Sequence, residues 1–230
     1  GILVGLSLAL SLPMVTFAAP PADAAADAAP IVILHTNDVH CGIDDAIGYA
    51  GLAAYKAEME AAYGADRVTL LDAGDAIQGG ALGTLSDGAF VVDIMNQAGY
   101  DLAVPGNHEF DYGMENFLTL ADSRSDFPWL SCNFMDLTAG TPALDPYLIQ
   151  DYGDIQIAYV GISTPESLTK TAPACFQDEN GNFIYGFCQG QDGALLYAAV
   201  QSAVDSARAQ GADYVVAVGH LGNEGITPEY

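Results

Sequence analysis

Apolar residues along this chain follow two patterns, short continuous runs and longer segments with a helical repeat. The short runs have the length typical of buried strands, and they occupy residues 31–35, 68–71, 100–104, 129–132, 155–162 and 214–218. The segments with apolar positions at helical spacing occupy residues 46–63, 89–97, 113–121 and 193–210. This alternation of strands and helices predicts an α/β fold with crossover connections. Residues 164–191, which are rich in Gly, Pro, Asn and Gln, are expected to form a long surface excursion.

Four of the apolar runs end on side chains that can bind metals or move protons. These residues are Asp38 and His40, Asp75, Asn107 and His108, and His220. Each one alone has an ordinary explanation as a cap, a turn residue or a packed histidine. Ligands of open α/β sheets bind at the carboxyl ends of the strands. The recurrence of such residues at strand ends therefore predicts an active site at that edge.

The most concentrated stretch is Gly106-Asn107-His108-Glu109-Phe110-Asp111, which places an amide, an imidazole and a carboxylate in one turn. Asp38 and His40 are two residues apart, and on an extended chain such residues point to the same side. We therefore expect them to serve one cation together. His35 has no comparable partner in the sequence and is interpreted as a structural histidine.

Carboxylate, imidazole and amide oxygen form a mixed ligand set that suits Zn, Mn, Fe or Co. Because an aspartate can bridge two ions, the set fits a hydrolytic site with two divalent metals. His108 is then free to stabilise developing charge or to protonate the leaving oxygen, and Asp111 is close enough to hold its ring. A helix N-cap ahead of residues 113–121 is an alternative or additional role for Asp111.

The charge balance narrows the range of partners. The chain has 230 residues, with Lys+Arg 5 against Asp+Glu 30 and a formal net charge of -25. With so few cations, binding to nucleic-acid polymers or anionic membrane surfaces is not expected, whereas a small phosphate ester held by metal ions is compatible. The sequence also lacks a P-loop and a Gly-x-Ser-x-Gly elbow, so NTPase and serine-hydrolase chemistry are not favoured.

The N-terminal part predicts export. Residues 1–29 are interpreted as a signal-peptide remnant and an Ala/Pro-rich spacer, with an uncleaved anchor as the alternative, and residues 30–230 as the catalytic domain. We expect a secreted, periplasmic or cell-wall-associated protein without strong membrane association once the signal is cleaved.

The four cysteines of an exported chain allow three disulfide pairings. We predict a disulfide between Cys175 and Cys188, which would close the excursion of residues 164–191. Cys132, within an apolar run, is expected to be buried and free. Cys41 is expected to face away from His40 as a packed or disulfide-bonded thiol.

Four sequence stretches resemble, in order and spacing, the calcineurin-like metallophosphoesterases, and within them the secreted 5′-nucleotidase and UDP-sugar hydrolase family. The stretches are Asp38-Val39-His40, Gly74-Asp75, Gly106-Asn107-His108-Glu109-Phe110-Asp111 and Gly219-His220. The resemblance implies a sandwich of two sheets flanked by helices. It also implies one metal ion at Asp38 and His40, a second at Asn107 and His220, Asp75 as the bridge, and His108 with Asp111 as the catalytic dyad.

By the same resemblance, the substrate is a small extracellular nucleotide. Family members carry a further Gly-His-x-His-type motif after the position of His220 and then a nucleoside-binding domain, and we expect both in the full-length protein beyond Tyr230. Three other reactions on the same site stay open: 2′,3′-cyclic-nucleotide phosphodiesterase, UDP-sugar hydrolase and thiosulfohydrolase. A non-catalytic surface binding protein is the alternative from a different class.

Overall fold

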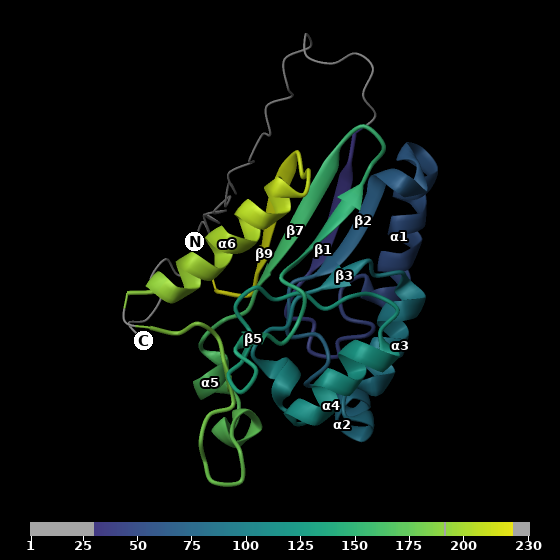
Figure 1. The fold of residues 1–230 in the computed structure, drawn as a ribbon. Helices are drawn as coiled ribbons and strands as arrows, with labels where there is room; N and C mark the ends of the chain where they lie inside the picture. Colours follow the sequence, from purple (N-terminus) through teal and green to yellow (C-terminus); the bar gives the residue numbers. More distant parts are fainter. Residues whose placement is uncertain (1–29, 191, 223–230) are drawn as a thin grey trace, which may run out of the picture.

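The computed structural model describes residues 30–190 and 192–222. The predicted leader, residues 1–29, lies outside the described residues. A first sheet consists of three parallel strands in the order β1 (Val32–Thr36), β2 (Val68–Asp72) and β3 (Leu102–Ala103). Two helices, α1 (Gly48–Tyr63) and α3 (Ala89–Ala98), lie between these strands in the chain and cover one face of the sheet (Figure 1).

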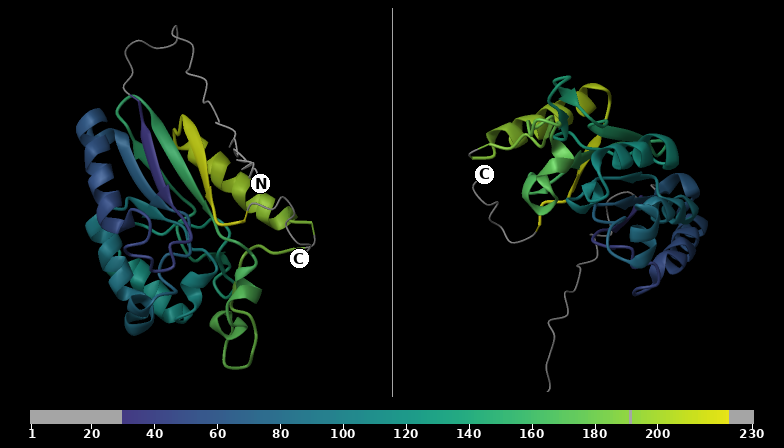
Figure 2. Two further views of the ribbon diagram at one scale, coloured as in Figure 1. Left: turned by 180° about the vertical axis from the view of Figure 1, so that it is seen from behind. Right: turned by 90° about the horizontal axis from the view of Figure 1, so that it is seen from below.

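A second sheet lies against the other face of the first. Its strands follow the order β6 (Tyr147–Asp151), β7 (Gln156–Ile162) and β9 (Tyr214–Gly219), with β6 antiparallel and β9 parallel to β7. Helix α6 (Ala194–Ala209) covers its outer face. Figure 2 shows from behind that α6 and the early helices lie on opposite sides of the two sheets.

Side-chain alternation along the strands creates the four layers. Leu70 packs with the residues of α1 and α3, whereas the next residue, Leu71, packs with Tyr159 and Val218 of the second sheet. On β7, Val160 points the other way and packs against Leu196 of α6. Because successive strand residues face opposite sides, one apolar run can serve two cores. The predicted sandwich of two sheets flanked by helices is confirmed.

Smaller elements complete the described part of the fold. An antiparallel sheet is formed by β5 (Thr141–Pro142), β4 (Met135–Asp136) and β8 (Tyr185–Gly186). The short helices are α2 (Ala81–Ser86), α4 (Met114–Thr119), which continues as a π-turn over Leu120–Arg124, and α5 (Ser167–Lys170). Single 3₁₀ turns cover Ala65–Arg67, His108–Phe110 and Pro173–Phe176. Among the helices described, none is long and apolar enough to cross a membrane.

Residues 129–132 were predicted to form a strand, but they do not form a regular one. Its backbone groups bond to three different places: Leu130 N donates to Ala103 O at 2.8 Å, Ser131 N to Asp145 O at 2.9 Å and Cys132 N to Gly161 O at 2.8 Å. The segment therefore passes from the edge of one sheet to the other, and it forms isolated bridges where a continuous ladder was expected.

The described part of the predicted excursion, residues 164–190, is more than a surface loop. Phe176 and Phe187 are fully buried, and both rings lie against Phe110 of the turn that follows β3. These aromatic contacts hold the excursion in place. The predicted disulfide between Cys175 and Cys188 is absent, and all four cysteines are free thiols. The prediction that Cys132 is buried and free is confirmed.

Candidate metal centre

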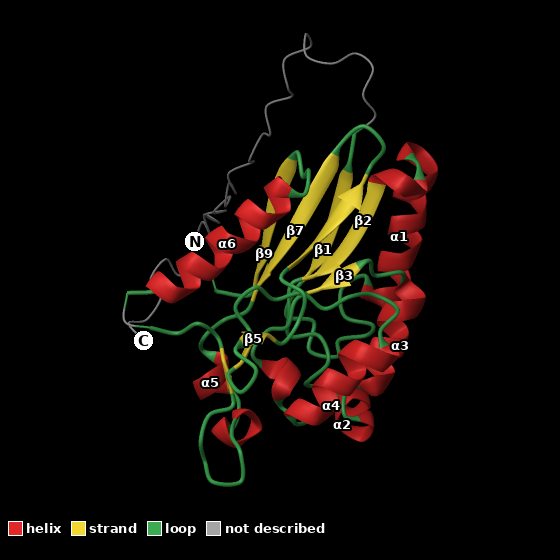
Figure 3. Ribbon diagram, viewed as in Figure 1, coloured by secondary structure: helices red, strands yellow, loops and turns green. Residues whose placement is uncertain are grey.

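The carboxyl ends of β1, β2, β3 and β9 meet at one edge of the sandwich, where Figure 3 shows the loops gathered below the strands. An open cleft of about 340 Å³ lies there. Six of the seven predicted site residues line it, and they are Asp38, His40, Asp75, Asn107, His108 and His220. The seventh, Asp111, lies behind His108 and contacts its ring.

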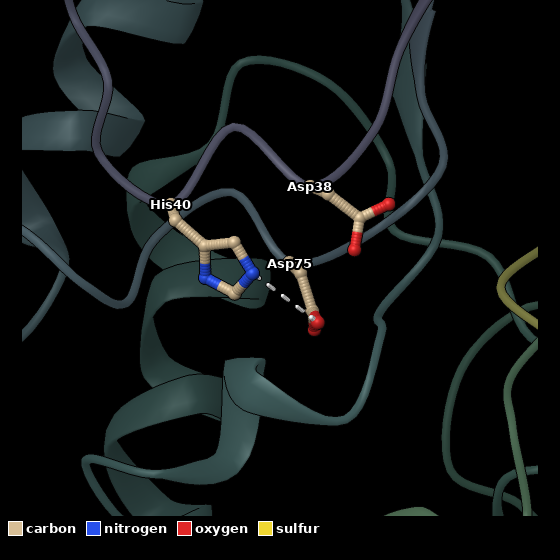
Figure 4. Close-up of side chains that lie close together, drawn as sticks. All are labelled: Asp38, His40 and Asp75. Atoms are coloured by element: carbon tan, nitrogen blue, oxygen red, sulfur yellow. Dashed lines mark ion pairs between the residues drawn. The ribbon is translucent and has the colours of Figure 1, made fainter. Parts of the chain in front are cut away.

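Asp75 lies at the centre of the candidate ligands. One ligand atom from each of Asp38, His40 and Asp75 falls within 4.8 Å of the other two. Figure 4 shows these three side chains close together. Asp75 Oδ2 is 3.8 Å from His40 Nε2 and 3.3 Å from His220 Nε2. His220 Nε2 is in turn 4.0 Å from Asp38 Oδ1. A carboxylate with an imidazole on either side is compatible with a ligand that bridges two cations.

The three histidines of the cleft present the same ring atom to it. The Nδ1 atom of His40 lies 3.2 Å from Gln78 O, that of His220 lies 2.8 Å from Ala73 O, and that of His108 lies 2.7 Å from Asp111 Oδ2. A hydrogen bond from Nδ1–H to an oxygen leaves Nε2 with its lone pair available. His40 and His220 can therefore each offer Nε2 to a cation.

Asp38 and His40 were predicted to point to the same side because the chain was expected to be extended there. That reason is wrong, because the loop after β1 is not extended. Both residues adopt left-handed backbone conformations, with φ of 53° and 46°, and Asp75 does the same with φ 61°. Backbone bonds hold this conformation: Asp38 N donates to Gly74 O at 2.9 Å and His40 N to Asp75 O at 2.9 Å. The two ligand loops are thus paired to each other, and strained backbone of this kind concentrates at functional sites.

Two glycines allow the loops to approach this closely. A Cβ on Gly106 would lie 2.3 Å from Asp75 Oδ1, and one on Gly74 would lie 2.6 Å from the backbone nitrogen of Gly106. Gly74 also has φ +103°, a conformation that side chains rarely adopt. Both positions therefore require glycine for the ligand loops to meet.

His108 and Asp111 form the predicted pair, with a contact of 2.7 Å. Helix α4 begins after Gly113, which is its N-cap residue, so the alternative role of Asp111 as that cap is wrong. The second oxygen of Asp111 lies 2.6 Å from the hydroxyl of Thr171, and the same hydroxyl lies 2.5 Å from Asn107 O. The Thr171 side chain, which the sequence analysis missed, therefore fixes the carboxylate that fixes His108.

Glu109 is a second residue that the sequence analysis missed. It is fully buried, and its carboxylate accepts hydrogen bonds from four backbone N–H groups. The donors are Asp75 at 2.8 Å, Ala76 at 2.7 Å, Ile77 at 3.3 Å and Gly106 at 2.7 Å. Burial and the charge of Asp75 outweigh the hydrogen bonds from the N–H groups of Asp75, Ala76 and Gly106, and the pKa of Glu109 is raised. Glu109 thus ties the loop after β2 to the loop after β3.

The electrostatics of the cluster favour a cation. Burial raises the pKa of Asp75, but hydrogen bonds from His220 and from the backbone of His108 outweigh it, and the pKa is lowered. Burial lowers the pKa of His220, but the hydrogen bond and the charge of Asp75 raise it to about 9. Without a metal ion, these shifts favour a proton on His220 beside an ionised Asp75, and a bound metal ion would replace that proton.

Two residues outside the cluster were also assigned from sequence. Cys41 is buried away from the cleft, as predicted, and its thiol donates to Ile77 O at 3.1 Å. The reason given was wrong, because Cys41 also has a left-handed backbone, with φ 61°. His35 takes no part in the cluster. It was expected to be a structural histidine, but its side chain is exposed along a groove between β1 and β9.

The residues present fit divalent metal ions. Two carboxylates and two imidazole Nε2 atoms converge, and the two carboxylates would repel each other without positive charge between them. Nitrogen and oxygen donors of this kind suit borderline divalent metals. Asn107, at the rim of the same cleft, can add its amide oxygen.

Known proteins resemble this chain in sequence and in fold. The 5′-nucleotidase of Diplobatis ommata is 32% identical over 211 residues, which cover 84% of this chain and 34% of the relative. The solved structure of the calcineurin-like phosphoesterase YfkN from Bacillus subtilis is 25% identical with a TM-score of 0.66, covering 84% of this chain and 62% of that one. Sulfate thiohydrolase SoxB from Thermus thermophilus is 28% identical with a TM-score of 0.62, covering 75% of this chain and 30% of that one.

The chain thus spans about a third of the length of the 5′-nucleotidase that it matches. A family model described as calcineurin-like phosphoesterase matches residues 31–229, which include every residue of the cleft. The fold, the ligand cluster around Asp75 and this match agree. The chain belongs to the calcineurin-like phosphoesterase family.

Proposed function

We propose that the protein hydrolyses phosphate monoesters of nucleotides with two divalent metal ions. The observation that carries the proposal is the position of Asp75, whose Oδ2 atom lies within 3.8 Å of Nε2 of both His40 and His220. Asp38 and His40 would hold one ion, and Asn107 and His220 the other. When bound, the ions would supply an activated water molecule and neutralise phosphoryl charge.

The residues of the chain then complete the reaction. His108 presents Nε2 to the cleft while Asp111 holds Nδ1, so the imidazole can stabilise negative charge on the phosphoryl group or give a proton to the leaving oxygen. A protein that only binds its ligand has no use for this pair, and we therefore favour an enzyme.

A nucleotide is preferred as the substrate because of the similarity to 5′-nucleotidases, at 32% identity over most of this chain. The likeness to sulfate thiohydrolase SoxB, at 28% identity, makes a thiosulfate-type ester the second candidate. We also propose an exported protein that acts together with a nucleoside-binding domain, on the basis of the leader pattern in residues 1–29 and the same relatives.

The test is phosphate release from AMP by the full-length protein, first treated with a chelator and then supplied with Mn, Co or Zn. We expect activity to return with metal and to fall by about 10² or more in His108→Ala. His35→Ala is the matched control, because it removes an exposed histidine outside the ligand cluster and should retain activity. Two bound metals without AMP hydrolysis would refute the nucleotidase proposal, and thiosulfate-type esters would be tested next.

A further inference from the structure

The cleft contains one strong cation in a chain that has few. Lys170 is the only lysine or arginine among the described residues that line it, beside Asp38, Asp75 and Glu166. Of the other four cations, Arg208 is exposed in the last turn of α6. The remaining three are paired with carboxylates: Lys56 with Asp101 at 3.0 Å, Arg67 with Asp154 at 2.6 Å and Arg124 with Asp93 at 2.5 Å.

Lys170 differs from these cations because no carboxylate of the described residues pairs with it. Glu166 lies four residues earlier and lines the same cleft, yet the two side chains form no ion pair within the described part of the chain. An uncompensated cation at the rim of an acidic cleft is available for an anionic ligand.

The backbone beneath Lys170 is fixed to the catalytic turn. Lys170 is the last residue of α5, and the next residue, Thr171, is only 3% exposed. The Thr171 hydroxyl lies 2.5 Å from Asn107 O and 2.6 Å from Asp111 Oδ1. This contact holds the start of the Lys170 side chain beside Asn107 and His108, which line the same cleft.

We infer that Lys170 binds a phosphoryl group of the substrate and thereby helps to select anionic esters. The inference rests on the proposed function. Lysine binds phosphate oxygens as a point charge through charge-assisted hydrogen bonds. Lys170 could contact either of two phosphoryl groups. One is the group that is transferred, and the other is a second phosphoryl group next to it in a diphosphate.

The experiment measures binding to the metal-loaded full-length protein by calorimetry, so it does not depend on turnover. The probes are inorganic phosphate, for the transferred group, and a methylene-bridged analogue of ADP, which carries two phosphoryl groups and is not hydrolysed. Lys170→Gln removes the charge. Arg208→Gln is the matched control, because Arg208 is an exposed cation in the last turn of α6, on a different face of the second sheet from the cleft.

We expect Lys170→Gln to weaken binding of the ADP analogue by about tenfold, the scale for one hydrogen bond to a charged group. Equally weakened phosphate binding assigns Lys170 to the transferred group, and unchanged phosphate binding assigns it to the second. Metal content should stay the same in all proteins. An affinity for the analogue that changes no more than in Arg208→Gln overturns the inference. Failure of AMP hydrolysis in the wild type would refute only the nucleotidase proposal.

Discussion

Neighbouring side chains in residues 106–111 have different environments. Asn107 and His108 line the cleft, whereas Glu109 and Phe110 are fully buried. The ring of Phe110 lies 5.0 Å from that of Phe117 and 5.2 Å from that of Phe134, so the turn is anchored in the core while its polar residues face the cleft. The contact between His108 and Asp111 could be predicted because the two residues are only three apart. Thr171 could not, since 60 residues separate it from Asp111.

At this scale we predict that Thr171→Val slows the reaction without removing the metals. Valine has nearly the same shape but no hydroxyl, so Asp111 Oδ1 loses its contact and the ring of His108 is held less firmly. We expect kcat to fall by about tenfold, the equivalent of one hydrogen bond, with little change in KM. Steady-state kinetics over a pH range would check this. Thr171→Ser should restore kcat, and a Thr171→Val protein with wild-type kcat and pH profile would contradict the prediction.

Elements were easier to predict from sequence than the loops between them. The strands at residues 31–35, 68–71 and 214–218 are confirmed as β1, β2 and β9, because a continuous apolar run has few alternatives to a buried strand. The loop conformations were not predictable. The left-handed backbone of Asp38 and His40 depends on bonds to residues 74 and 75, which are 36 and 35 residues away. The residues of the site were found from their types and positions, although the extended geometry assumed for them was wrong.

Glu109 joins the loops that follow β2 and β3, and we predict that replacing it weakens both the fold and the metal site. In Glu109→Gln, an amide nitrogen replaces one oxygen, and two backbone N–H groups then face a donor in place of an acceptor. Each unsatisfied buried N–H costs about 1–3 kcal/mol, so we expect the free energy of unfolding to fall by about 3 kcal/mol. Metal affinity should fall too, because Asp75 and Asn107 lie on the two loops.

Denaturant unfolding and metal titration of the folded protein would measure the two effects separately. Glu115→Gln is the matched control, since it makes the same chemical change at an exposed position in α4 and should alter neither quantity. A Glu109→Gln protein that loses stability but binds metal with unchanged affinity would show that Glu109 supports the fold without positioning the ligands.

In the molecule as a whole, the two sheets bring four strand ends to one edge, and the chain that carries this edge has a large excess of negative charge. The formal net charge of -25 was evident from the sequence, and so was the class of the fold. The packing of residues 164–190 was not evident, because Phe176 and Phe187 contact Phe110, which is far away in the chain. The disulfide predicted for this segment is absent, since Cys175 and Cys188 are both free thiols, and the aromatic rings are what attach the segment to the core.

The net charge leads to a prediction about how the substrate reaches the site. A chain of charge -25 repels a nucleotide with a charged phosphate, even when two divalent ions occupy the cleft. Raising the ionic strength from about 0.01 M to about 0.15 M shortens the Debye length from about 30 Å to about 8 Å, so the repulsion is screened before the nucleotide arrives. We therefore expect kcat/KM for AMP to rise several-fold over this range at constant metal occupancy. Adenosine, which carries no phosphate, is the control, and its binding should not change. A kcat/KM that falls with salt would mean that the ions and Lys170 make the approach to the cleft attractive despite the charge of the chain as a whole.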